Sequence, residues 1–269
     1  MFPFLDLGFI KIPMYGIMGA LGATIAVLIA SFRKNRYDIK REDVLYSACF
    51  AGVGVLIGSK LLYAIVTLPH IIENSEKYSD SVIHFIVALF GGFVFYGGLI
   101  GGIIMGMIYG KIYKINPIKL VDIYAPLIPL IHGFGRIGCF FAGCCYGMPS
   151  EKYGVYFEAI GGAPQGIKLF PIQLVEAGIN FIVFAVLFTL AVKKVFKLGG
   201  ITGAYLSVYA IERFILEFFR YDSIRGSAFG ISTSQWISIV LLPIGIILIL
   251  FGEKIFKEKR GEPPQAISR

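Results

Sequence analysis

The sequence is poor in charged residues. Asp, Glu, Lys and Arg make up only 16% of its 269 residues, whereas a soluble globular protein has about a quarter. Hydrophobic residues account for 57% of the chain, and the mean hydropathy is +0.77. Long apolar runs recur over the whole length, which excludes a separate soluble domain. The composition therefore predicts an all-α polytopic membrane protein.

The sequence also lacks an extended basic segment and a signal peptide. The net charge is +8, but Lys and Arg stand in short clusters between apolar runs, as is typical of membrane proteins. This distribution excludes nucleic-acid binding. The opening residues have no basic n-region, and no small-residue cleavage site separates the apolar run at Met14 from Arg33. We therefore expect no cleavable signal peptide.

Apolar segments long enough to cross about 30 Å of hydrocarbon predict seven transmembrane helices. They are expected at 13–32, 44–68, 83–110, 120–146, 171–192, 199–219 and 235–252. The third is rich in glycine, so it either tilts strongly or breaks near Tyr96-Gly97-Gly98. A break at this depth would point to a cavity. For most of these glycines, close helix packing is the expected role.

Lys and Arg are divided unevenly between alternate loops. One side has sixteen of them and the other has six. The sixteen are Arg33, Lys34, Arg36, Lys40, Arg41, Lys111, Lys114, Lys119, Lys193, Lys194, Lys197, Lys254, Lys257, Lys259, Arg260 and Arg269. The six are Lys11, Lys77, Lys152, Lys168, Arg220 and Arg225. Because basic loops stay in the cytoplasm, the N-terminus is predicted outside and the C-terminus inside.

This topology predicts a multi-pass protein of the bacterial inner membrane with three parts. Residues 1–252 form the transmembrane domain, and 147–170 form a loop or small head at the outer face. Residues 253–269 form a charged cytoplasmic tail.

Ionisable residues inside the spans are the first candidates for a site, because each costs at least about 2.5 kcal/mol at the bilayer centre. Some lie near helix ends, where snorkelling to the interface and a functional role are both open. These are Lys60, His84, Asp122 and Glu176. Two other sets do not fit the snorkelling explanation.

The first set is His132 and Arg136, which share one helix face because they are four residues apart. A guanidinium beside Gly133, Gly135 and Gly138 lies next to bare backbone N–H groups, which suits phosphate binding. The alternative is a structural ion pair with the glycines used for packing.

The second set is Glu212, Arg213 and Glu217, followed by Arg220 and Asp222. Arg213 and Glu217 are four apart and are expected to pair along the helix. Either Arg213 converges with Arg136 on one anionic group, or the pair is purely structural.

Five segments resemble motifs of the prolipoprotein diacylglyceryl transferase family. The family signature GRxGNFxNxExxG is met by GRIGCFFAGCCYG at 135–147. Tyr-Gly in the first span is met by Tyr15-Gly16, and His-Gly-Gly in the third by Tyr96-Gly97-Gly98. The remaining matches are Pro171, Gln173, Leu174 and Glu176, and then Tyr209, Arg213, Phe214, Glu217 and Arg220.

The resemblance implies transfer of a diacylglyceryl group from phosphatidylglycerol to the lipobox cysteine of a preprolipoprotein, with release of glycerol phosphate. It implies a seven-span fold with a site toward the outer face of the bilayer. We expect no cofactor and no metal. The motif matches give Arg136, Arg213 and Tyr96 as candidate catalytic residues, and the residues themselves add His132, Cys139, Cys144 and Cys145 as further candidates. The implied substrate-binding residues are Tyr15, Gly97, Gly98, Gly147, Tyr209, Glu217 and Arg220.

The chain departs from the signature at the groups expected to act as a base and to position substrate. Cys139, Ala142 and Cys144 replace Asn, Asn and Glu, and Tyr96 replaces His. A phenol with a pKa near ~10 is a poor base, so His132 is our hypothesis for the base.

The cluster Cys139, Cys144 and Cys145 leaves several roles open. One is a disulfide from Cys139 to Cys144, or packing. Another is an enzyme nucleophile that carries an acyl group as a thioester. A third is metal binding, for which His132 is the one nearby candidate to complete four ligands. Cys49 is expected to be a small buried hydrophobe.

Two further functions are weighed against the family reaction. One is a divergent paralogue in which the cysteine cluster performs a different lipid or acyl transfer. The other is a non-catalytic phospholipid-binding protein or a transporter. The sequence shows no internal repeat of the kind common in transporters, which favours the enzyme.

Overall fold

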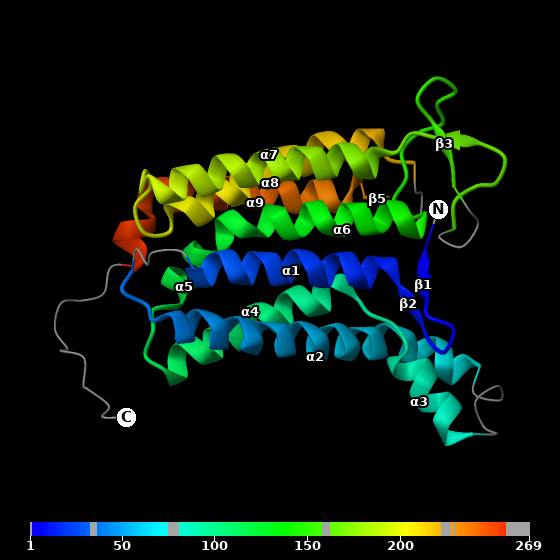
Figure 1. Cartoon of the computed structure of the whole chain (residues 1–269), viewed down its shortest axis with the longest axis horizontal. Coiled ribbons are helices and arrows are strands. Elements are labelled where there is room, and N and C mark those ends of the chain that lie inside the picture. Colours follow the sequence, from blue (N-terminus) through cyan, green and yellow to red (C-terminus); the bar gives the residue numbers. More distant parts are fainter. Residues whose placement is uncertain are drawn as a thin grey trace. The chain divides into compact units, whose positions relative to one another are not determined.

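The computed structural model describes residues 2–32, 37–74, 81–157, 162–221, 227–228 and 230–256. Helices dominate these residues (Figure 1). Contacts divide the chain into two units: Met1–Leu28 together with Val121–Arg269, and Ile29–Leu120.

The first unit contains most of α1 (Met14–Phe32) and the helices of the second half of the chain. These are α6 (Ile128–Ala142), α7 (Ile172–Val192), α8 (Gly200–Leu216) and α9 (Thr233–Phe256). The 3-10 turn η2 (Ala125–Leu127) joins α5 (Pro117–Tyr124) to α6, and η4 (Glu217–Phe219) extends α8. A buried cluster of Ala125, Leu187, Ala191, Ile201, Ala204 and Tyr205 joins η2, α7 and α8.

Three small antiparallel pairs of strands lie at the helix ends of this unit. β1 (Phe4–Asp6) pairs with β2 (Lys11–Pro13), and Leu5 lies opposite Ile12. β3 (Val155–Tyr156) pairs with β4 (Lys168–Leu169), and β5 (Ser227–Ala228) pairs with β6 (Ile231–Ser232). Leu169 of β4 forms a small buried core with Tyr146, Phe157 and Ala163, and Val155 of β3 packs against it. The described part of 147–170 is therefore folded.

The second unit consists of α2 (Arg41–Glu73), α3 (Val82–Phe90) and α4 (Phe95–Ile112). Here the sequence predicts one span at 83–110, tilted or broken near Tyr96. The chain does break, but at Gly91–Val94, and Tyr96-Gly97-Gly98 lies inside the first turns of α4. Lys60 of α2 donates a hydrogen bond to the carbonyl oxygen of Phe90 and lies 4.0 Å from the ring centre of Phe93. Lys60 therefore caps the broken helix and does not snorkel.

Five helical segments among the described residues are long and apolar enough to cross a membrane. They are α1, α2, the stretch Pro117–Ala142, α7 and α9, and α4 has a shorter apolar stretch. The protein is thus a multi-pass helical membrane protein. The prediction of seven spans stays a prediction. The predicted span 120–146 is wrong at its C-terminal end, because Gly143 adopts φ 71° and ends α6 at Ala142.

Asp122, which the sequence allows to snorkel, is instead a buried helix cap. Its carboxylate accepts hydrogen bonds from the backbone N–H groups of Gly199 (2.7 Å) and Thr202 (3.2 Å), and from the Thr202 hydroxyl. Only 2% of Asp122 is exposed. The charge is stabilised at the N-terminus of α8, where unpaired N–H groups and the helix dipole favour an anion.

Glycines let α2 and α4 pack in contact along their backbones. A Cβ on Gly54 or Gly58 would overlap the carbonyl oxygens of Gly101 and Gly97, respectively. Both helices thus carry glycines four residues apart at the interface, an arrangement that favours close association in lipid. The expectation that glycines serve packing is confirmed here, including for Gly97.

We predict that Gly54→Ala destabilises the protein whereas Gly52→Ala does not. The new methyl group on Gly54 meets backbone that cannot move aside, and such overpacking costs about 1–3 kcal/mol. Nothing lies within 4 Å of a Cβ at Gly52, so that variant serves as the matched control. Thermal unfolding of the two purified variants in detergent measures the difference. Equal midpoints would contradict the proposed backbone contact.

Candidate functional site

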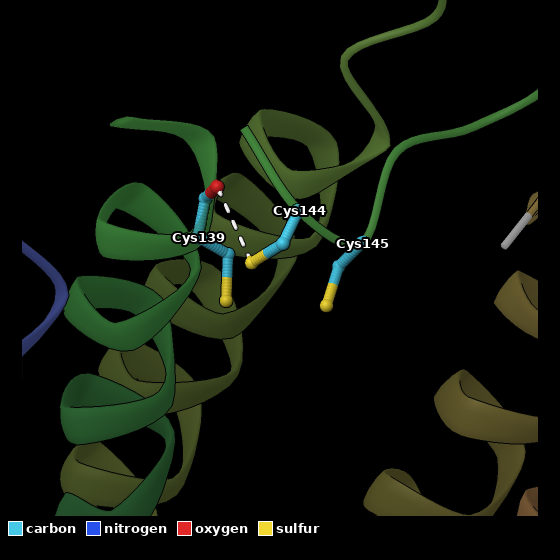
Figure 2. A group of neighbouring side chains, drawn as sticks. All are labelled: Cys139, Cys144 and Cys145. Atoms are coloured by element: carbon cyan, nitrogen blue, oxygen red, sulfur yellow. Dashed lines mark hydrogen bonds between the residues drawn. The ribbon is translucent and has the colours of Figure 1, made fainter. Parts of the chain in front are cut away.

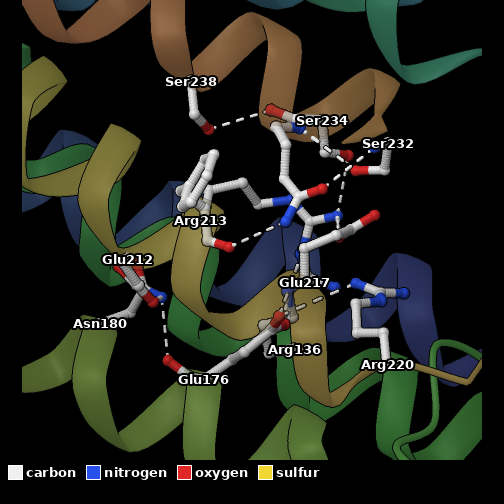
Figure 3. A network of polar contacts seen from close by, with 12 residues as sticks. Arg136, Glu176, Asn180, Glu212, Arg213, Glu217, Arg220, Ser232, Ser234 and Ser238 are labelled. Atoms are coloured by element: carbon white, nitrogen blue, oxygen red, sulfur yellow. Dashed lines mark hydrogen bonds and ion pairs between the residues drawn. The ribbon is translucent and has the colours of Figure 1, made fainter. Parts of the chain in front are cut away.

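A buried carboxylate on α7 lies at the centre of a polar network (Figure 3). The Oε2 atom of Glu176 lies 2.5 Å from Nε of Arg136 on α6. Its Oε1 atom lies 3.4 Å from a guanidinium nitrogen of Arg213 and 3.7 Å from one of Arg220. Glu176 is only 2% exposed, which rules out its alternative sequence interpretation as a snorkelling residue.

A second carboxylate supports Arg213 from its own helix. Glu217 Oε2 lies 2.6 Å from Arg213, which confirms the pairing predicted from their four-residue spacing. The Arg213 guanidinium also donates a 3.0 Å hydrogen bond to the hydroxyl of Ser234 at the start of α9. Arg213 is thereby fixed by groups on three helices.

Arg220 is positioned by the backbone that follows α8. A bridge pairs Gly147 with Arg220, and the N–H groups of Met148 and Tyr221 bond to the carbonyls of Phe219 and Tyr146. Gly147 has no room for a side chain, because a Cβ would lie 2.9 Å from the carbonyl oxygen of Phe170. The loop after α6 thus holds Arg220 against Glu176.

The three guanidiniums face two directly paired carboxylates, which leaves one positive charge in this group of five. The exposed fraction of the side chain is 24% for Arg136, 8% for Arg213 and 3% for Arg220. Arg136 is therefore the most exposed of the three arginine side chains. A preorganised set of donors of this kind binds a phosphate group bidentately and favours negative charge.

The hydrogen-bonded network continues away from the arginines to Glu212. Asn180 donates to the backbone carbonyl of Glu176 at 2.9 Å and to Glu212 Oε1 at 2.7 Å. Next to Glu212, an apolar depression runs along α7 and α8. Its apolar lining is Ile179, Val208, Ile211, Ile215 and Leu216.

The three cysteines of the signature lie together where α6 ends (Figure 2). Their sulfur atoms lie within 4.8 Å of one another, and Cys144 Sγ is 3.7 Å from the carbonyl oxygen of Cys139. All four cysteines of the chain are described, and each is a thiol. The disulfide alternative between Cys139 and Cys144 is thus not present in the structure. Cys49, expected to be buried, is exposed on α2.

Tyr15 of α1 joins this end of α6 through a close helix contact. A Cβ on Gly138 would lie 3.0 Å from the Cα atom of Tyr15, so only glycine permits this approach. The Tyr15 hydroxyl interacts electrostatically with Arg136 and with all three clustered cysteines. The sequence-predicted residues Tyr15, Arg136 and the cysteines therefore form one neighbourhood.

His132 lies one turn before Arg136 and contacts α8. Its Nδ1 atom is 3.5 Å from the hydroxyl of Tyr205, and its ring centre is 5.6 Å from that of Tyr209. These contacts fix the ring between α6 and α8, and the assignment of His132 as the base stays a prediction.

Tyr96, Gly97 and Gly98 belong to the second unit. Gly97 and Gly98 pack on α2, where a Cβ would overlap the carbonyl oxygen of Gly58 and the hydroxyl of Ser59, respectively. Their predicted roles in catalysis and substrate binding stay predictions.

The comparisons with known proteins agree with this geometry. The family model described as prolipoprotein diacylglyceryl transferase matches residues 3–251. The chain belongs to this family. It is 37% identical over 240 residues to a Clostridium tetani protein named phosphatidylglycerol–prolipoprotein diacylglyceryl transferase, covering 89% of this chain and 92% of the relative. A Clostridium perfringens relative, named as transferase 2, is 33% identical over 94% of this chain and 96% of its own length.

Membership of the prolipoprotein diacylglyceryl transferase family makes the chain a transferase, as the resemblance of its motifs implied. Sequence reasoning nevertheless missed the role of Glu176 in this site. The residue is part of the family segment Pro171–Glu176, and that match was the available signal. Its position near the start of a predicted span left snorkelling equally open.

We predict that Glu176→Gln lowers the stability of this transferase. The change leaves three buried guanidiniums short of one negative charge, and breaking a buried ion pair costs about 3–5 kcal/mol. Thermal unfolding in detergent should show a midpoint lower by at least about 5 °C. Glu151→Gln is the control, because its pair with Lys168 spans 3.8 Å and the Glu151 side chain is 90% exposed. An unchanged midpoint for Glu176→Gln would contradict the central position of this carboxylate.

Proposed function

We propose that this chain transfers the diacylglyceryl group of phosphatidylglycerol to the thiol of a prolipoprotein lipobox cysteine. The observation that carries the proposal is the convergence of Arg136, Arg213 and Arg220 on one buried carboxylate, in a chain of this family. The names of the relatives state the same donor and acceptor.

The surplus positive charge of the three arginines and their two directly paired carboxylates matches the donor lipid. The headgroup of phosphatidylglycerol has one phosphate with a single negative charge, and a second charge develops as glycerol phosphate leaves. Arg136 binds the phosphate first, because its side chain is the most exposed of the three arginines. Arg213, fixed by Glu217 and Ser234, stabilises the developing charge. Such preorganised donors act strongly in a site of low dielectric constant.

The reaction balances with the acceptor thiol as nucleophile. The thiolate attacks the glyceryl carbon that bears the phosphate ester. The C–S bond forms as the C–O bond breaks, and the electron pair leaves with the phosphate oxygen of glycerol phosphate. The thiol proton goes to a base or to solvent. No oxidation or reduction occurs.

Several further predicted site residues of the first unit have supporting roles in this proposal. Tyr15 lies near Arg136 and the cysteine cluster and would contact the headgroup there. Gly147 and Arg220 hold the loop that borders the site. Tyr209 packs against His132, the proposed base. The depression along α7 and α8 offers an apolar path for an acyl chain that enters from the bilayer.

We predict that Arg136→Gln and Arg213→Gln each reduce transfer by about 10²–10³-fold, because each removes a donor to the phosphate. The assay incubates the purified chain with phosphatidylglycerol and a lipobox peptide and detects the thioether-linked product by mass spectrometry. Arg41→Gln is the control, since Arg41 lies at the start of α2 with its guanidinium 4.4 Å from the ring centre of Phe32.

The same assay separates the family reaction from the two alternatives. Undiminished transfer by Arg136→Gln would refute the phosphate role. A lipid adduct on Cys139, Cys144 or Cys145, with an unmodified peptide, would indicate a cysteine-based acyl transfer. Binding of phosphatidylglycerol with neither product would indicate a non-catalytic lipid-binding protein. A His132→Ala variant with full turnover would remove His132 as the base.

We also propose seven spans in the bacterial inner membrane, with the N-terminus and the site at the outer face. The support is the excess of Lys and Arg in alternate loops. Several counted charges lie outside the described residues: Arg33, Lys34, Arg36, Lys77, Arg225, Lys257, Lys259, Arg260 and Arg269. Asp222 and the tail from 257 onward also lie outside them.

We predict that reporter fusions will follow this topology. Alkaline phosphatase inserted after Tyr153 should be active, because this exposed turn is expected outside the cytoplasm. The same insertion after Lys194 should be inactive, and green fluorescent protein at the C-terminus should fluoresce. The reverse pattern would overturn the orientation, and activity at both insertion sites would overturn the span count.

A further inference from the structure

The cysteine cluster has the dimensions of a metal site. Three sulfur atoms lie within 4.8 Å of one another at the end of α6 (Figure 2). Around a tetrahedral zinc ion with Zn–S bonds of 2.3 Å, neighbouring sulfur atoms are about 3.8 Å apart. The thiols therefore need to approach by no more than about 1 Å to bind one ion.

The backbone holds the three thiols in this arrangement. Gly143 adopts φ 71°, and the N–H group of Cys144 bonds to the carbonyl of Cys139 at 3.2 Å, which folds the chain back over the helix end. Cys145 adopts φ 63°, a left-handed conformation that is uncommon for residues other than glycine. Residues in this conformation are found preferentially at functional sites.

A neighbouring glutamine ties the loop of the cluster to α7. Nε2 of Gln173 donates a 2.7 Å hydrogen bond to the carbonyl of Cys144, and the Gln173 residue is fully buried. Its Oε1 atom is buried and accepts no hydrogen bond from any residue in the described part of the chain. That atom is available to a bound group.

The donor set points to zinc with an open coordination position. Thiolates select soft or borderline ions such as Zn²⁺. Within the described ranges, no fourth His, Cys, Asp or Glu joins the group. The nearby candidate from the sequence, His132, contacts Tyr205 and Tyr209 instead. Three protein ligands with one open position are typical of catalytic zinc, whereas structural zinc has four.

We propose that Cys139, Cys144 and Cys145 bind one Zn²⁺, and that its open position takes the acceptor thiol of the lipobox cysteine. This replaces the expectation from sequence that the chain holds no metal. The inference rests on the proposed function for its acceptor, whereas the metal site itself does not depend on it.

The metal supplies the deprotonated acceptor that the reaction requires. A free cysteine has a pKa near ~8.5, and binding to Zn²⁺ removes its proton, which is released to solvent. The bound sulfur attacks the glyceryl carbon, the C–S bond forms, and the C–O electron pair leaves with glycerol phosphate. Zn²⁺ does not change its oxidation state, so no oxidant or reductant is needed.

The location of the cluster fits this role. Cys139 follows Arg136 by three residues and so lies on the same face of α6. Arg136 interacts electrostatically with Cys139 and Cys145. The leaving phosphate and the attacking sulfur would therefore meet in one place. Cys139 and Cys144 also occupy positions where the signature has Asn and Glu. The metal would therefore supply the activation of the thiol for which this chain lacks those polar groups.

The first test measures metal in the full chain, purified in detergent under reducing conditions without chelator. Inductively coupled plasma mass spectrometry should find about one zinc per chain. Cys144→Ser and Cys145→Ser should lose most of it, while Cys49→Ser, outside the cluster, should keep it. Thermal unfolding checks that the variants are folded. Two variants are used because Cys139 is buried and its replacement risks misfolding.

The second test examines the open position with Co²⁺ in place of zinc. Thiolate ligation gives an intense charge-transfer absorption, and a lipobox peptide should shift the visible bands, whereas the same peptide with Ser for Cys should not. Arg136→Gln should keep the metal and this spectral shift while losing transfer.

Each outcome separates the metal site from the proposed function. A wild-type chain that transfers lipid without stoichiometric zinc, or folded cysteine variants that retain zinc, would overturn the metal site and leave the proposed function standing. Zinc binding with no spectral response to the cysteine peptide would overturn the acceptor role. Zinc binding and the spectral response without any transfer would refute the proposed function but not the metal site.

Discussion

The buried carboxylate of Glu176 is the interaction on which the site depends. Three guanidiniums approach it from α6, from α8 and from the segment after η4. In a low-dielectric interior, neither the carboxylate nor the arginines are tolerated alone, so each stabilises the others. The same charges that cross-link these segments also leave a positive excess, where we propose that the phosphate of the lipid binds. Glu176 therefore both holds these segments together and sets the net charge of the proposed phosphate site.

The surrounding helices are brought close by small residues, since lipid provides no hydrophobic force between them. Gly138 allows α1 to reach α6, and Gly203 and Gly245 allow the backbones of α8 and α9 to approach each other. Asp122 fixes the start of α8 through two backbone N–H groups. Together these contacts fix the position and orientation of Arg213, as the proposed phosphate site requires.

Local spacing predicted much of this arrangement. The four-residue interval predicted the pair of Arg213 and Glu217, and apolar length predicted the positions of most helices. The meeting of Glu176 with Arg136 and Arg220 was beyond such reasoning, because it joins segments 40 and 44 residues away along the chain. The sequence predicted the helix break near Tyr96, a few residues after its position at Gly91–Val94. Glycine content indicates a region where a helix can break, but it does not specify which residues leave the helix. The gathering of the three thiols depends on the left-handed turn at Gly143 and Cys145, which the sequence indicates only through its glycine.

Neighbouring residues of α6 lie on two different faces of the helix: one face carries the ionisable side chains, and the other contacts α1. Arg136 and Cys139 point toward the site, while Gly138 touches α1. One inserted or deleted residue would rotate everything beyond it by about 100° and would exchange these faces. The segment can therefore diverge by substitution alone, at fixed length. A change of chemistry in this segment must therefore come from substitutions that keep its length. The cysteines at positions 139 and 144 of the signature are substitutions of that kind.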